Sequence, residues 1–271
     1  SEMCIRDRVT QHITSRYPEY TCGEHHLIEN MEDCERVVNT MHTCLLKVPW
    51  SGSGKGLNWC LHGFTKPVSN WCERVLREQG CLTAEPIYNK VKDFALEFYS
   101  DGQGEVRFAG YSVFSTNEHG AYTGNLLASD GQIEESIACC LSLEKLTGIR
   151  EALRAELASI YGNTYTGYLG VDMMVCRSDK EDGYCVHPCV EINMRMNMGV
   201  VARLFYDRFV APGSKGCFAV EYLPDNETLR ARHEQDMHDY PLTVEQGRLA
   251  SGYLPLVPVT GKSCYRVYVR I

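Results

Sequence analysis

The chain has 271 residues, of which 44% are hydrophobic and 23% charged, and its formal net charge at pH 7 is −8. These values are typical of a globular protein with one large domain or two, and the acidic charge disfavours a general nucleic-acid surface. No apolar run reaches the roughly 18 residues of a membrane span, and no segment has the pattern of a signal peptide. We therefore expect a cytoplasmic protein with neither a nucleic-acid nor a membrane partner.

Fourteen cysteines are present, without a repeated zinc-ligand spacing. Most lie inside apolar runs, where a free thiol packs as a small hydrophobe. The best candidate for a metal pattern is Cys185, His187 and Cys189, which has no second pair nearby. We therefore expect reduced thiols and no zinc site.

The first eight residues read SEMCIRDR, which resembles the translated read-through of a sequencing adaptor. We expect residues 1–8 to be a non-native leader and the natural N-terminus to be missing; an ordinary frayed terminus is the alternative. Residues 9–24 show no clear periodicity. Apolar residues at helical spacing then predict a helix over 29–42, beginning at Glu29 or Asn30.

A short strand with a lysine follows this helix. The sequence of residues 44–56 is CLLKVPWSGSGKG, in which Pro49 ends the strand that carries Lys47. The loop after it consists of Ser51, Gly52, Ser53, Gly54, Lys55 and Gly56. Glycine-rich loops turn backbone N–H groups toward phosphates, although this one matches neither a Walker A loop nor a GxGxxG motif. A lysine in a buried strand needs an anion, whereas a flexible turn beside a surface lysine is the simpler alternative.

The middle of the chain alternates helices, strands and turns. We predict a helix at 69–79 ending at Gly80, a strand at 81–85, a hinge at 86–88, strands at 94–99 and 105–116 around a turn at 101–104, and helices at 133–141 and 146–161. Residues 117–125 are predicted to be a polar loop. Its His119, Tyr122 and Asn125 suit hydrogen bonds to a substrate, but the composition is equally that of any exposed loop.

A hairpin of two apolar strands carries the acidic residues. The first strand, 167–176, holds Asp172, and the second, from about Val186, ends in Glu191, Ile192 and Asn193. Side chains two apart point to one face of a strand, so Glu191 and Asn193 project together and the hairpin brings Asp172 beside them. Oxygen ligands in this arrangement suit Mg²⁺, although such pairs are also often merely solvated. A helix at 199–210, a strand at 217–222, a charged stretch to residue 239 and a strand at 264–271 complete the chain.

The order of these parts resembles the ATP-grasp superfamily, which includes carboxylate–amine ligases such as D-alanine–D-alanine ligase and biotin carboxylase. The resemblance covers about residues 9–208. It implies an α+β fold with two subdomains, whose antiparallel sheets enclose the nucleotide between them. The expected domains are a small subdomain at 9–86, a large subdomain at 87–212 and a C-terminal extension at 213–271.

The resemblance also assigns roles to residues. Lys47 would hold nucleotide phosphates, and the loop at 51–56 would fold over the triphosphate. Glu85 and Ile87 would contact adenine at the hinge, and Asp93 would contact ribose, with Glu97 as a rival. The expected ligands of Mg²⁺ (or Mn²⁺) are Asp172, Glu191 and Asn193. Arg195 would steady the transferring phosphoryl group or the acyl phosphate.

The implied function is an ATP-dependent ligase that activates a carboxylate as an acyl phosphate for attack by an amine or similar nucleophile. Its expected cofactors are ATP and Mg²⁺, its partners are small molecules, and an oligomer is possible. The alternatives are an ATP-grasp kinase and a non-catalytic nucleotide-binding module. The family usually has a second phosphate-binding lysine and an N-terminal domain that shapes the acceptor site. Both would lie before or within residues 1–8, so the chain departs from the family's usual pattern.

Overall fold

The structure is a computed structural model that describes residues 2–50, 56–117, 121–180 and 183–271. The chain divides into two compact units. Unit 1 comprises residues 1–92, 119–121 and 173–192, and unit 2 comprises the rest, namely 93–118, 122–172 and 193–271. Within the described part of the chain, no helix is long and apolar enough to cross a membrane.

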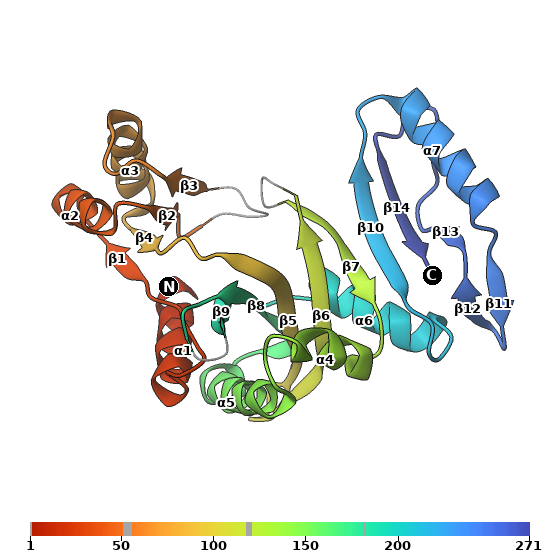
Figure 1. Ribbon diagram of the computed structural model, residues 1–271, viewed down its shortest axis with the longest axis horizontal. Helices are drawn as coiled ribbons and strands as arrows, with labels where there is room; N and C mark the ends of the chain where they lie inside the picture. The colour runs from red at the N-terminus through yellow and green to blue at the C-terminus, as the bar shows by residue number, and fades with distance from the viewer. Residues whose placement is uncertain (1, 51–55, 118–120, 181–182) are drawn as a thin grey trace. The chain divides into compact units, whose positions relative to one another are not determined.

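Unit 1 is built on a four-stranded antiparallel sheet with the order β1-β4-β2-β3. Its strands are β1 (His26–Ile28), β2 (Cys44–Lys47), β3 (Leu57–Cys60) and β4 (Leu82–Glu85). The helices α2 (Met31–Met41) and α3 (Lys66–Gln79) lie together beside this sheet (Figure 1). Their apolar sides and one face of the sheet form a single core that includes Cys34, Cys44, Cys60 and Cys72, so these cysteines pack as hydrophobic residues.

Local signals explain the ends of these helices. The side chain of Asn30 caps α2 by accepting from Asp33 N, and Gly80 ends α3 in the left-handed conformation with φ of 79°. Helix α3 begins at Lys66, earlier than the predicted Ser69. The prediction missed this first turn because Lys66-Pro67 lacks an inward apolar pattern. Polar N-caps at Ser129 and Ser142 likewise start α4 (Asp130–Ala138) and α5 (Leu143–Tyr161) three positions before the predicted residues 133 and 146.

Helix α1 (Glu2–Arg16) was not predicted. Its first half consists of residues from the expected leader, whose non-native origin stays a prediction. Val9 and Ile13 are fully buried on this helix, four positions apart, while most of its other side chains are polar. Two apolar anchors on a polar helix give too weak a periodicity to be read from the sequence. Strand β3 was also missed, because its four residues follow the glycine-rich segment directly.

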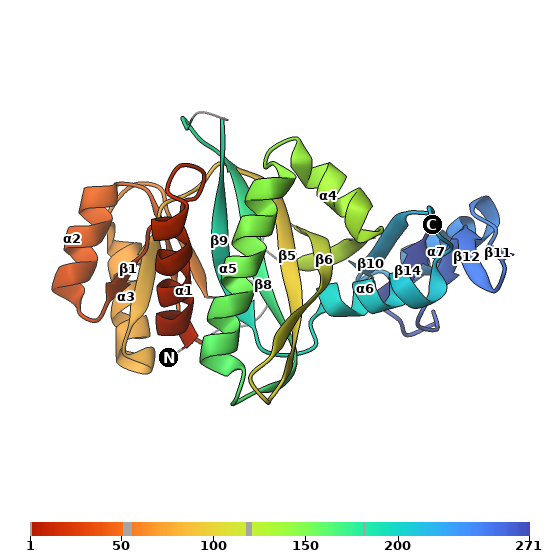
Figure 2. The same cartoon turned by 90° about the horizontal axis from the view of Figure 1, so that it is seen from below.

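The larger sheet has the strand order β13-β14-β10-β7-β6-β5-β8-β9. Its strands are β5 (Lys90–Asp101), β6 (Val106–Thr116), β7 (Tyr122–Leu127), β8 (Thr166–Arg177), β9 (Tyr184–Asn193), β10 (Gly216–Tyr222), β13 (Tyr253–Pro255) and β14 (Tyr265–Arg270). Strands β8 and β9 contribute residues to both units. In unit 2, β6 contacts α4 (Asp130–Ala138), α5 (Leu143–Tyr161) and α6 (Met198–Phe209), and Figure 2 shows α5 running along the sheet.

Strand β7 corrects the predicted loop at 117–125, which is wrong from Tyr122 onward. A glycine signals a loop in sequence, but Gly124 is needed in this strand because a side chain there would collide with the backbone of Phe218 on β10. The charged stretch before residue 239 contains the unpredicted helix α7 (Asn226–Asp239), in which Leu229 is the buried residue. Strands β11 (Thr243–Glu245), β12 (Arg248–Ser251) and β13 are too short to have been recognised.

Candidate functional site

The face of the small sheet opposite α2 and α3 carries the predicted lysine. Leu46 on β2 is paired with Ala84 on β4, and both point into the core. Because side chains alternate along a strand, the neighbouring Lys47, Thr83 and Glu85 lie on the other face. Lys47 and Thr83 are directly paired across the two strands. The register therefore gathers polar groups on the face opposite α2 and α3.

Glu85 is the centre of a buried charge cluster on this face. Lys47 Nζ lies 2.5 Å from Glu85 Oε2, and Arg6 Nη1 on α1 lies 2.6 Å from Glu85 Oε1. Burial alone would raise the pKa of Glu85, but the charges of Lys47 and Arg6 outweigh it and lower the pKa below its ordinary value. Glu85 is therefore an ionised carboxylate with a cation on each oxygen.

Two further groups lie beside this cluster. Thr83 is fully buried, and its Oγ1 has no hydrogen-bond partner among the described residues. His187 on β9 is also buried and stacks edge-on against Tyr88; burial lowers the pKa of His187 to about 4, so its ring is neutral at pH 7. An unsatisfied hydroxyl is costly in a protein interior, which suits a polar group supplied by a ligand.

The other parts of the predicted nucleotide site are partly described. Ile87 lies half-buried in the irregular segment between β4 and β5, which fits a hinge. The loop residues 51–55 lie outside the described residues. The residues that flank this segment are joined by a hydrogen bond, in which Val48 N donates to Gly56 O at 3.1 Å. Gly56 has a φ of 80°, which favours glycine. Arg6 was not recognised as a site residue, because α1 gives no readable pattern.

In unit 2, three of the predicted residues form a chain of hydrogen bonds. Asn193 Nδ2 donates to Asp172 Oδ2 at 3.1 Å, and Arg195 Nη2 donates to Asn193 Oδ1 at 3.3 Å. Asp172 and Asn193 are half-buried, whereas Arg195 is exposed. Glu191 is exposed on β9, two positions before Asn193, and its convergence with the other two stays a prediction. The described residues contain no group of three or more His, Cys, Asp or Glu side chains arranged to hold a metal.

The two candidates for the ribose contact differ in burial. Asp93 is half-buried near the start of β5, whereas Glu97 on the same strand is only 1% exposed. Glu97 Oε2 accepts a hydrogen bond from Asn197 Nδ2 at 2.8 Å. Burial favours Asp93 over Glu97 as a group that a ligand reaches, although the role of Asp93 stays a prediction.

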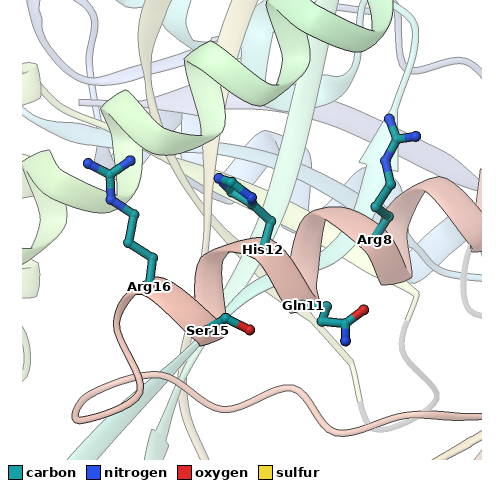
Figure 3. Close-up of a pocket in the computed structure, with 5 residues that line it drawn as sticks. All are labelled: Arg8, Gln11, His12, Ser15 and Arg16. Carbon is teal, nitrogen blue, oxygen red and sulfur yellow. The ribbon is translucent and has the colours of Figure 1, made fainter.

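Helix α1 also presents a basic side, which is shown in Figure 3. Arg8, His12 and Arg16 are exposed and project from one side of the helix because they are four positions apart. Together with Gln11 and Ser15 they line a shallow surface pocket. This basic side was missed for the same reason as Arg6.

Comparisons with known proteins show similarity in structure but not in sequence. No family model matches the chain, and no curated protein does. The chain is similar to N5-carboxyaminoimidazole synthetase from Staphylococcus aureus complexed with ADP, with 13% identity and a TM-score of 0.55 over 97% of this chain and 67% of that one. It is also similar to the ATP complex of carboxyaminoimidazole ribonucleotide synthase from Aspergillus clavatus, with the same identity, TM-score and coverages.

A third similar structure is the biotin carboxylase domain dimer of 2-oxoglutarate carboxylase from Hydrogenobacter thermophilus, in complex with MgADP, ADP and bicarbonate. The identity is 12% and the TM-score 0.54, over 98% of this chain and 61% of that one. The chain thus spans about two thirds of the length of these structures or less. At such identities the similarity establishes the fold, and it confirms the predicted α+β fold of the ATP-grasp type.

Proposed function

We propose that this chain, which has the ATP-grasp fold, is part of an ATP-dependent ligase that activates a carboxylate as an acyl phosphate. The observation that carries the proposal is Lys47 on the face of the small sheet opposite α2 and α3, held by the buried Glu85 beside the unsatisfied hydroxyl of Thr83. The similar structures support it, because they are complexes with ADP, ATP or MgADP. The nucleophile that accepts the acyl group is an amine or a similar group.

Lys47 binds the phosphates of ATP in this proposal. Its ammonium already faces an anion, Glu85, so a triphosphate replaces one anionic partner by another. Arg6 stays on the other carboxylate oxygen, so Glu85 keeps a cation when Lys47 turns to the phosphates. Glu85, through its backbone, and Ile87 bind adenine at the hinge. The glycine-rich segment at 51–56 covers the triphosphate, and Asp93 binds ribose.

Asp172, Glu191 and Asn193 are the proposed ligands of Mg²⁺ or Mn²⁺. Their carboxylate and amide oxygens are the donor atoms that these hard cations prefer, and Asn193 already orients its amide between Asp172 and Arg195. When bound, the cation offsets the negative charge of the phosphates during transfer. Glu191 is exposed, so its carboxylate is accessible to a cation from the solvent.

The proposed reaction has two steps. A carboxylate oxygen attacks the γ-phosphorus of ATP, and the bond to the β,γ-bridging oxygen breaks and releases ADP. The nucleophile then attacks the acyl carbon, and inorganic phosphate leaves. Arg195 is exposed and has the planar fork that binds a carboxylate or phosphoryl group in bidentate fashion, so it holds these oxygens as charge develops.

Product analysis distinguishes this function from its alternatives. The chain is incubated with ATP, Mg²⁺ and a panel of small carboxylic acids and bicarbonate, with and without amines. A ligase yields ADP, phosphate and the joined product only when both substrates are present. A phosphorylated product that accumulates in place of a joined one indicates a kinase, and nucleotide binding without turnover indicates a non-catalytic module.

Small-molecule substrates, a cytoplasmic location and self-association complete the proposal. The Hydrogenobacter thermophilus domain is described as a dimer, which supports testing self-association by analytical ultracentrifugation.

A further inference from the structure

Glu97 is a buried carboxylate in the interior of unit 2 that the proposed reaction does not use. It is 1% exposed, and the hydrogen bond from Asn197 Nδ2 reaches only its Oε2. Glu97 Oε1 has no hydrogen-bond partner in the described part of the chain. Because a half-satisfied buried carboxylate is costly, its presence suggests a role beyond packing.

Two glycines leave space for this carboxylate. A side-chain carbon at Gly170 on β8 would collide with Glu97 Oε2 and with Asn197 Nδ2. A side-chain carbon at Gly199, in the first turn of α6, would collide with Glu97 Oε1 and with Ser112 Oγ. The hydrogen bond between Glu97 and Asn197 therefore passes directly over Gly170, which is two positions before Asp172.

Strand β8 thus holds both ends of the segment 193–197. At one end Asn193 donates to Asp172, and at the other end Asn197 lies against Gly170 and donates to Glu97. Asn197 is also the N-cap of α6, since its Oδ1 accepts from Val200 N at 2.9 Å. Arg195 is the middle residue of this segment.

We propose that Glu97 is a positioning residue, which fixes the segment 193–197 through Asn197 and so holds Asn193 and Arg195 in place for the reaction. This inference rests on the proposed function. Glu97 itself does not touch the substrate, because it is enclosed in the core.

The surroundings of Glu97 make its charge sensitive to pH. The polar and charged groups around it are the hydroxyl of Ser112 on β6, the amide of Asn197, and Arg203 on α6, which packs on Gly110 opposite Glu97 and is paired with Asp130 and Asp207. Burial raises the pKa of Glu97 to about 7, although the Asn197 hydrogen bond opposes that shift. An ionised carboxylate accepts this hydrogen bond more strongly than a neutral one, so the segment is held more firmly above pH 7.

The test compares Glu97→Gln, Glu97→Ala and Asn197→Ser with the wild type. Serine keeps the N-cap but is too short to reach Glu97 as well. We expect kcat of the wild type to rise with pH through an ionisation near 7. In Glu97→Gln this ionisation disappears and kcat stays at the acid-limb value. Glu97→Ala and Asn197→Ser lower kcat about 10- to 100-fold with KM for ATP within a few-fold, because a small misplacement of reacting groups has effects of this size.

A second readout does not depend on activity. Amide exchange at Val200, whose N–H is bonded to Asn197, should be faster in Glu97→Ala but not in Ser142→Ala, which removes the cap of the distant helix α5. Absence of turnover in the wild type would refute the proposed function. Turnover in the wild type with an unchanged kcat and pH profile in both Glu97→Gln and Asn197→Ser would refute the positioning role alone, and these two variants decide the question if Glu97→Ala does not fold.

Discussion

Replacing Lys47 by methionine removes the ammonium group and keeps most of the side chain's length and packing. In the structure this ammonium lies 2.5 Å from Glu85, which is 4% exposed. Glu85 keeps Arg6 as a partner in the variant. We therefore expect a loss of unfolding free energy of about 1.5–3 kcal/mol, the contribution of one hydrogen bond to a charged group. Leaving a buried charge without any partner would instead destabilise by about 3–5 kcal/mol.

The same substitution should weaken ATP binding by more than about tenfold, because a charge-assisted phosphate contact contributes roughly 1.5–3 kcal/mol. Titration with a fluorescent ATP analogue measures the affinity, and urea unfolding at pH 7 measures the stability. The double variant Arg6→Met/Glu85→Gln is the matched control. It removes the other cation together with the carboxylate charge, so Lys47 can turn to the phosphates without leaving a buried charge unpaired. We expect its ATP affinity to stay within a few-fold of the wild type.

These variants distinguish a phosphate ligand from a structural partner of Glu85. If Lys47→Met binds the analogue as tightly as the wild type does, Lys47 is a structural partner of Glu85 and not a phosphate ligand. If Arg6→Met/Glu85→Gln loses as much affinity as Lys47→Met, the effect comes from a disturbed charge cluster and not from a lost phosphate contact.

Other changes test the remaining residues. Glu191→Gln should abolish Mg-ATP turnover with little loss of stability, because its side chain is exposed; circular dichroism checks the fold. Arg195→Lys should lower kcat about a hundredfold with ATP affinity within a few-fold, since transition-state charge is affected most. Glu97 has a pKa of about 7 against an ordinary 4.5, so it favours folding most below pH 4.5, and on the order of 3 kcal/mol is lost as pH rises from 4.5 through 7. Glu97→Gln should abolish this loss in urea unfolding. His187 acts oppositely: its pKa of about 4 lies below the ordinary 6.5, so its contribution is complete above pH 6.5 and is lost as pH falls toward 4; His187→Gln should flatten that acid limb.

The sequence was sufficient for the fold because long elements have strong local signals. The apolar stripe of α5, the hairpin of β5 and β6 and the left-handed Gly80 are all readable without tertiary context. Strand β7 was not, since the close approach of β10 that requires Gly124 is a contact between distant parts of the chain.

The site shows the same limit. Lys47 was found because a lysine in an apolar strand is unusual, but nothing in the sequence indicates that its anion is Glu85, 38 positions away on β4, or that Arg6 completes the cluster. The environment of Glu97 was equally hidden. Its burial depends on Gly170, which lies inside the predicted strand 167–176, and on Gly199, at the start of the predicted helix; neither position indicates in the sequence that it must leave space for a carboxylate.

Positional isotope exchange in ATP tests the central claim most directly. ATP labelled with ¹⁸O at the β,γ-bridging position is incubated with the chain, Mg²⁺ and the acid panel, without any amine. Reversible formation of an acyl phosphate frees the β-phosphate of ADP to rotate, so the label moves from the bridging to the non-bridging positions. We predict exchange that requires both Mg²⁺ and a particular acid and is lost in Glu191→Gln. Joined product formed on addition of an amine, with no exchange under any condition and no acyl phosphate trapped from the enzyme by hydroxylamine, would contradict the account.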